Sequence, residues 1–286
     1  MHSHFGTERG YLFQTEEERK HAEANYNREL EPLTEEEIVE DLREANVRSM
    51  LNFGFTWNSP IDEVRSLHDY AEELISNNRD VFLGLWVAVD PTIGYQALNE
   101  LERCVRDRNL GLVGFTIMGT GLGIPPNHSS VEPFYDLCKV HNVPVHVLVG
   151  YTGWGAGFDG GRGYYQNYCH PQYLDQLAAD HPELKIIASR PAWPWQSEMI
   201  ASIMHKGNIV GYELHGWKPQ YFPDELKNDL GYRIKDEVMF GADYPLFEYD
   251  ELFKGWEQID LDDELMEKIR YKNAERIFSE HFDYDL

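Results

Sequence analysis

Short apolar runs that alternate with helix-like segments most constrain how this chain can fold. Seven runs follow residue 45 and suit strands: 49–55, 81–89, 112–118, 143–150, 184–189, 208–214 and 237–243. These runs are too continuously apolar for a sheet with one face in water, so they predict a parallel sheet covered by helices. We therefore expect a single α/β domain spanning residues 1–286.

Helical signals fill the gaps between the runs. Residues 34–37 (TEEE) and 129–132 (SSVE) are both capping-box sequences, and each predicts the start of a helix. Residues 5–33 are polar without a clear period and are interpreted as a surface excursion. Further helices are expected near 61–77, 93–107, 171–180, 195–206, 224–229 and 262–278.

The charge of the chain limits its partners. Fifty Asp and Glu residues stand against 25 Lys and Arg, which gives a formal net charge of −25. Such self-repulsion argues against nucleic acid or an anionic membrane as a partner. The acidic residues are spread along the chain, which is typical of a salt-adapted, halophilic protein because salt screens the repulsion. An ordinary acidic enzyme is the alternative.

The spacing of the cysteines and the length of the apolar segments indicate the cellular compartment of the protein. The three cysteines are widely spaced and form no CxxC pair, which favours reduced, buried thiols in a cytoplasmic protein. The N-terminus lacks the layout of a signal peptide. No segment approaches the roughly eighteen consecutive apolar residues that span a membrane.

The chain opens with a His-x-His sequence at His2 and His4. Two imidazoles spaced in this way on a strand share one face and suit a metal ion. No strand-length sequence precedes them, and chain termini fray unless they are tied down. We therefore expect the first strand to be missing or truncated, with its place left open or filled by something other than residues 1–4.

Several stretches, taken in order, resemble the amidohydrolase superfamily, and in particular its aminocarboxymuconate semialdehyde decarboxylase-like ("amidohydrolase 2") branch. They are HSHFG (2–6), PPN (125–127), HPQYLDQLAADHPELKIIA (170–188), WPW (193–195), FGADYP (240–245) and KNAERIF (272–278). The resemblance implies a (β/α)8 TIM-like barrel whose site lies at the C-terminal ends of the strands.

The resemblance also implies a ligand set for one metal ion, often zinc. In the family His-x-His of strand 1, a histidine ending strand 5 and an aspartate ending strand 8 hold the ion, and a histidine ending strand 6 acts in catalysis. His2, His4 and Asp243 match the first pair and the aspartate. The metal would lower the pKa of a bound water and polarise the substrate.

Two positions depart from this pattern. Leu148 takes the place of the strand 5 histidine, and His146 lies on the same face about one layer deeper, roughly 6–7 Å along the strand. Arg190 takes the place of the strand 6 histidine, in SRPAWPW where the family has Ala-His-Pro-Gly-Trp-Pro-Trp. Leucine offers no donor and arginine repels a cation. We therefore expect an incomplete metal site, with zinc weakly held or absent.

Other residues have two interpretations each. Arg190 is either a clamp for a substrate carboxylate or a structural cation, and Asp243 is a base, a metal ligand or a turn cap. His215 follows the sixth run at the expected barrel mouth and is a candidate catalytic group, with a structural role as the alternative. His146 is either a core residue or a weak ligand. His170 is expected to start a helix.

The segment 150–169 is rich in glycine and aromatic residues and suits a lid or an oligomer contact. Trp154 in this segment and Trp193 in the WPW sequence are expected to contact substrate. We predict a hydrolase or carboxy-lyase for a small carboxylated or aromatic substrate, assembled as a homo-oligomer. The alternative is an inactive barrel that serves as a binding or assembly subunit.

Overall fold

The computed structural model describes residues 2–10, 15–54, 56–57 and 59–279. One sheet of parallel strands runs in chain order from β1 to β8, which confirms the predicted barrel fold. The strands are β1 (His2–His4), β2 (Ser49–Asn52), β3 (Phe82–Val87), β4 (Leu112–Ile117), β5 (Val145–Leu148), β6 (Ile186–Ser189), β7 (Ile209–Leu214) and β8 (Val238–Phe240).

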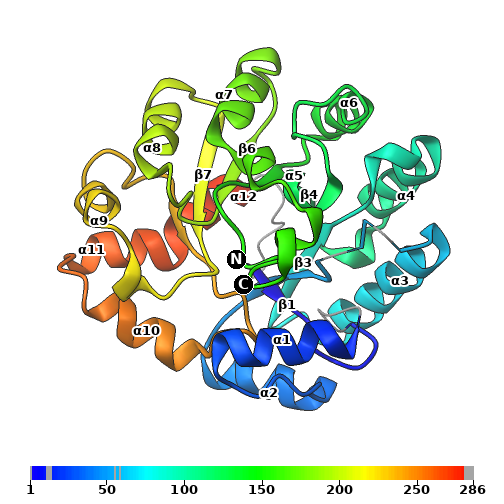
Figure 1. Ribbon diagram of the computed structural model, residues 1–286, viewed down its shortest axis with the longest axis horizontal. Coiled ribbons are helices and arrows are strands. Elements are labelled where there is room, and N and C mark those ends of the chain that lie inside the picture. The colour runs from blue at the N-terminus through cyan, green and yellow to red at the C-terminus, as the bar shows by residue number, and fades with distance from the viewer. Residues whose placement is uncertain (1, 11–14, 55, 58, 280–286) are drawn as a thin grey trace.

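Helices surround the strands, as Figure 1 shows. The α-helices are α1 (Glu16–Tyr26), α2 (Glu35–Glu44), α3 (Ile61–Asn77), α4 (Tyr95–Arg106), α5 (Gly119–Leu122), α6 (Glu132–His141), α7 (Pro171–Asp180), α8 (Gln196–His205), α9 (Asp224–Leu230), α10 (Tyr249–Glu257), α11 (Asp263–Glu267) and α12 (Asn273–Phe278). Short 3-10 turns are η1 (Pro91–Ile93), η2 (Arg108–Leu110), η3 (Asp159–Gly163), η4 (Gln166–Cys169) and η5 (Pro219–Tyr221), and η6 (Lys268–Lys272) is a π-helical turn.

The N-terminal caps of the helices can be compared with the caps predicted from the sequence. Thr34 caps α2 through the predicted capping box, with its hydroxyl on the Glu37 amide and the Glu37 side chain on the Thr34 amide. His170 caps α7 by accepting from the Gln172 amide, as expected. The prediction of a second capping box at residues 129–132 is wrong. Val131 occupies the cap position of α6, and no side chain in the described ranges caps that helix. The polar segment 5–33 contains α1, which begins at a Thr15 cap that was not predicted.

The expectation of an open place for the first strand is wrong. β1 pairs in parallel with β2 on one side. On the other side Ser3 bridges Tyr244 just after β8, and the His4 amide donates to the Tyr244 carbonyl at 2.7 Å. The Ser3 hydroxyl lies 2.8 Å from the Tyr249 hydroxyl. Three residues suffice as a strand here because both neighbours are already in place, and they close the sheet on itself.

Apolar side chains fill one end of the barrel and leave polar groups at the other. Trp86 fits inside because Gly114 faces it: a Cβ at this glycine would lie 1.9 Å from the indole ring. Around Trp86 a buried cluster joins strand residues to α12, which crosses behind the strands in Figure 1. No helix in the described ranges combines the length and apolarity needed to cross a membrane.

Candidate active site

Three side chains from the joined edges of the barrel meet in a small triangle. Nε2 of His2 lies 3.2 Å from Nε2 of His4, and the two nitrogens lie 3.4 and 3.1 Å from Oδ1 of Asp243. All three residues are buried. Bonds of about 2.0–2.1 Å from a tetrahedral zinc ion would place neighbouring donors about 3.3 Å apart. The spacing of these three atoms therefore fits the ligands of one metal ion.

The hydrogen bonding of His4 supports the same conclusion. Its Nδ1 lies 2.8 Å from the carbonyl oxygen of Asn52, so Nδ1 carries the hydrogen and donates it. Nε2 of a neutral His4 ring then has a lone pair that faces a carboxylate oxygen of Asp243 at 3.1 Å. Two acceptors repel at this distance unless a proton or a metal ion lies between them.

Asp243 lies in left-handed backbone just after β8, with φ of 60°. Burial by itself would raise the pKa of its carboxyl, but His215 and Arg190 beside it hold that pKa well below its usual value. Burial also lowers the pKa of His2 and of His215. Asp243 is therefore an ionised acceptor and a poor base.

His215 directly follows β7 and reaches Asp243 beside His2, with 4.2 Å between the two ring centroids. Its Nδ1 lies 3.0 Å from Oδ1 of Asp243, and its Nε2 lies 2.5 Å from the hydroxyl of Ser189. The structure thus brings His215 to the site where its position after the sixth apolar run predicted it. Both ring nitrogens have protein partners in this arrangement.

Arg190 follows β6 with φ of 76° and points toward Asp243. Its Nη2 lies 3.3 Å from Oδ2 of Asp243, and its Nε has no hydrogen-bond partner among the described residues. Gly216 makes room for this pair, since a Cβ there would lie 2.7 Å from Nη1 of Arg190. Arg190 therefore combines a weak contact to the site carboxylate with an unused donor.

His146 lies one layer deeper in the barrel, as its position on β5 predicts. Its Nε2 lies 2.7 Å from Oε2 of Glu213, and its Nδ1 lies 3.0 Å from the Thr116 hydroxyl. Trp86 stacks on the imidazole at 4.8 Å between ring centroids. His2, His146, Glu213 and His215 offer donor atoms close together, but His146 already has partners for both nitrogens. Its weak assignment as a metal ligand remains a prediction, and the geometry favours a buried hydrogen-bonded pair with Glu213.

A small cavity lies over the triangle. Its volume is about 30 Å³, and it is lined by His2, His4, Asn52, Gly54, Trp57, Ala88, Thr116, Met118, Leu148, Arg190 and His215. Leu148 thus offers an apolar wall where the family pattern has a ligand. A cavity of this size is too small for an aromatic acid, so the mouth must open to admit one. A larger hollow, of about 800 Å³, lies between α2 and α12 and contains none of these residues.

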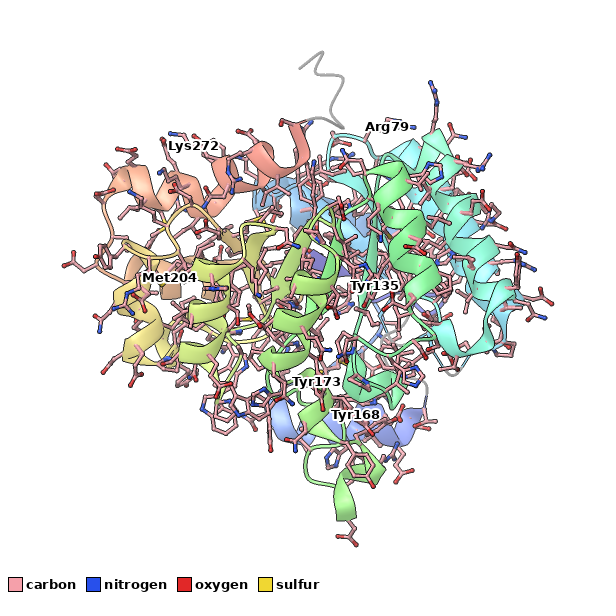
Figure 2. All side chains as sticks on the ribbon, turned by 90° about the horizontal axis from the view of Figure 1, so that it is seen from above. Arg79, Tyr135, Tyr168, Tyr173, Met204 and Lys272 are labelled. Atoms are coloured by element: carbon pink, nitrogen blue, oxygen red, sulfur yellow. The ribbon has the colours of Figure 1, made fainter. Side chains whose placement is uncertain are left out.

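Two segments meet above the mouth. The loop 150–169 contacts α1, and both project from the same end of the barrel in Figure 2, near the labelled Tyr168. Arg162 of the loop lies 2.6 Å from a Glu18 carboxylate oxygen, and its guanidinium lies over the Phe158 ring at 3.9 Å. His21 of α1 packs on the same Phe158 ring. We call these four residues the latch.

The two predicted aromatic contacts lie outside the cavity lining. The Trp154 ring contacts Trp57, a lining residue, at 6.4 Å between centroids. Trp193 is half-exposed and packs on Tyr151 and Trp217. Either ring could meet substrate only with the mouth open.

Three polar residues of the site were not predicted from the sequence. They are Asn52, Ser189 and Glu213, which orient His4, His215 and His146 respectively. Each is a polar residue within an apolar strand run, and that position is the signal that could have found them. The three cysteines all belong to the described residues, and there they are buried and free of disulfides, as expected.

Comparisons with known proteins agree with the family resemblance and with the barrel fold. A model of the amidohydrolase family matches residues 1–279. A comparison with curated protein sequences gives no match. Among solved structures, an uncharacterised TIM-barrel protein from Bordetella bronchiseptica is 17% identical over 98% of this chain and 99% of its own, with a TM-score of 0.71.

Two further structures are decarboxylases solved with manganese. The 5-carboxyvanillate decarboxylase of Novosphingobium aromaticivorans, with 4-hydroxy-3-methoxy-5-nitrobenzoic acid, is 18% identical over 97% of this chain and 94% of its own, with a TM-score of 0.68. The dihydroxybenzoic acid decarboxylase of Polaromonas sp., with 2-nitroresorcinol, is 16% identical over 99% and 98%, with a TM-score of 0.65. At these identities the likeness is one of fold.

Proposed function

The chain belongs to the amidohydrolase family, and on that basis we propose that it is a carboxy-lyase for a small aromatic carboxylate. The observation that carries the proposal is the triangle of His2, His4 and Asp243, with Arg190 beside it at the same cavity. A metal site and a cation for an anionic substrate then lie within reach of one another.

His2, His4 and Asp243 would hold one divalent ion. Two imidazoles and a carboxylate suit zinc, and manganese is the ion that the two decarboxylase structures contain. When bound, such an ion polarises substrate oxygens and stabilises negative charge that develops on them. The low pKa of Asp243 favours a ligand over a general base.

Arg190 would orient the substrate. Its Nε, which lacks a partner among the described side chains, and its remaining guanidinium hydrogens can donate to a carboxylate or a phenolate oxygen. Trp57, Met118 and Leu148 supply the apolar wall against which a ring would pack. Loss of carbon dioxide breaks the bond between the ring carbon and the carboxylate carbon. The electron pair stays on the ring carbon, which takes up one proton from solvent.

A second candidate is a barrel that binds a ligand without turnover. It is favoured by Leu148 at a ligand position and by the contact between Arg190 and Asp243, which both oppose a tightly bound metal. In that case the same cavity and the same arginine serve recognition only.

The decisive experiment combines turnover and binding in one protein preparation. The chain is loaded with zinc or manganese and incubated with a panel of hydroxylated benzoates, and carbon dioxide release is measured beside the thermal shift that each compound causes. Release that disappears in Asp243→Asn supports the carboxy-lyase. A thermal shift without release from any compound favours the binding subunit, and light scattering on the same sample tests the expected homo-oligomer.

A further inference from the structure

A chain of two hydrogen bonds links Ser189 to Asp243 through His215. The Ser189 hydroxyl lies 2.5 Å from Nε2 of His215, and Nδ1 of the same ring lies 3.0 Å from Oδ1 of Asp243. All three residues are buried. The order of atoms is that of a serine–histidine–aspartate triad.

The direction of both hydrogen bonds follows from chemistry. An ionised carboxylate only accepts, so Nδ1 of His215 must carry the hydrogen that it donates to Asp243. Nε2 of a neutral ring then has a lone pair, into which the Ser189 hydroxyl donates. By donating to Nε2, the Ser189 hydroxyl disfavours the other tautomer of His215, in which Nε2 would carry the hydrogen.

We infer that Ser189 is a positioning residue that fixes His215 as its Nδ1–H tautomer and thereby holds the Asp243 carboxylate toward His2 and His4. What the held carboxylate is for rests on the proposed function, but the tautomer does not. Ser189 stands where the family pattern has alanine, so the hydroxyl is a feature of this chain.

Two observations argue that Ser189 acts through His215 rather than as a nucleophile. Its side chain is fully buried on β6, and it does not line the cavity that His215 and Arg190 line. The backbone also supports a fixed ring: a Cβ on Gly241 would lie 2.8 Å from Cβ of His215, so the facing strand packs directly against the base of the side chain.

The tautomer can be measured on the full chain without metal or substrate. Long-range proton–nitrogen NMR on 15N-histidine-labelled protein at neutral pH separates protonated from unprotonated ring nitrogens, and His215→Gln identifies the signals. We expect one protonated nitrogen, Nδ1, and one unprotonated nitrogen, Nε2, for His215. Two protonated nitrogens, or the Nε2–H form, would overturn the inference.

Variants test the role of the hydroxyl. Ser189→Ala should give mixed tautomers at His215 and weaken manganese binding about tenfold or more, in the range seen for residues that orient metal ligands. Ser189→Thr, which keeps the hydroxyl, should restore the single tautomer, and Ser202→Ala on α8 is the matched control. An unchanged His215 spectrum in Ser189→Ala would refute positioning. So would a fluorophosphonate adduct on Ser189, which would make this serine a nucleophile.

Discussion

Nη2 of Arg190 lies 3.3 Å from Oδ2 of Asp243, so a permanent cation faces the carboxylate that would ligate a metal ion. A guanidinium cannot lose its charge by deprotonation in a protein. At the end of β5, Leu148 adds a wall without a donor atom. A divalent ion at His2 and His4 would therefore meet a competing cation and find three protein ligands instead of four.

Metal content should change when these two positions are restored. We expect the native chain to purify with well under one zinc per molecule and to bind added metal weakly. Leu148→His with Arg190→His adds two neutral donors and removes a charge, so affinity should rise by about tenfold or more. Elemental analysis and calorimetric titration measure both effects. Arg233→His, on an exposed residue far from the barrel mouth, controls for an added histidine. Stoichiometric zinc held tightly by the native chain would contradict an incomplete site.

Arg190 should also decide ligand binding. Small aromatic carboxylates should raise the melting temperature of the native chain, because two parallel hydrogen bonds to a guanidinium are stronger than neutral ones. Arg190→Ala should abolish the shift, and Arg190→Lys should keep a part of it, since an ammonium lacks the fork geometry. A shift that survives in Arg190→Ala would mean that the acid binds elsewhere.

The latch should control access to the cavity. Arg162→Ala removes the ion pairs with Glu18 and Glu17 and the contact with Phe158, which together contribute about 1 kcal/mol to the closed form. Cleavage of the loop by a protease should then accelerate roughly fivefold, because cleavage follows the open population. Arg233→Ala is the control, since Arg233 also combines an ion pair, with Asp229, and an aromatic contact, with Tyr232. Equal cleavage rates in the two variants would show that α1 does not hold the loop.

The barrel could be predicted from sequence because its strands carry a local signal. Apolar runs such as 184–189 are buried on both faces, and this leaves little choice other than a parallel sheet. β1 could not be predicted in this way. Its three residues depend on the hydrogen bond from His4 to Tyr244 and on the Ser3–Tyr249 contact, and both partners lie more than 200 positions away.

The residues of the candidate site also fall into two groups, those that a sequence pattern predicts and those that depend on contacts between distant segments. Asp243, which matches a family pattern, could be placed at the barrel mouth from that pattern. His2 matches the same pattern, but the expected loss of the first strand left it without a place in the barrel. Ser189 and Asn52 could not, because their roles follow from the ring atoms that they face in space. The pairing of His146 with Glu213 was missed for the same reason: they lie on β5 and β7, which are not adjacent in the sheet.

Salt should stabilise the protein. A formal charge of −25 on 286 residues causes repulsion between the acidic side chains. This repulsion is stronger in the folded state, where the charges lie closer together, and salt screens it. The melting temperature should therefore climb through a potassium chloride series into the molar range, beyond what screening of a few ion pairs would give. A parallel series with a neutral osmolyte at matched water activity is the control. The osmolyte is excluded from the protein surface as salt is, but it does not screen charges. A flat potassium chloride series would remove the salt-adaptation hypothesis.

Acid should destabilise the protein through Glu100, which is buried between α3 and α4. His68 lies 2.6 Å from Oε1 of Glu100, and Arg103 contacts both carboxylate oxygens at 2.8 and 2.9 Å. Burial alone would raise the pKa of Glu100, but these hydrogen bonds lower it to about 2. Because the folded pKa lies below the usual value of 4.5, the stabilisation is fully present above pH 4.5 and is lost as the pH falls toward 2.

Glu100→Gln should therefore lower the free energy of unfolding by about 2 kcal/mol near neutral pH, since His68 and Arg103 lose their charged partner. The difference from the native chain should shrink steadily as the pH falls from 4.5 toward 2. Urea midpoints at a series of pH values measure it, and subtraction of the native curve removes the other carboxyl groups. Glu102→Gln, which changes a partly exposed carboxylate on the same helix, should give a small and nearly constant difference. A Glu100→Gln difference that stays constant through this range would mean that the carboxylate stabilises the helix pair by packing alone.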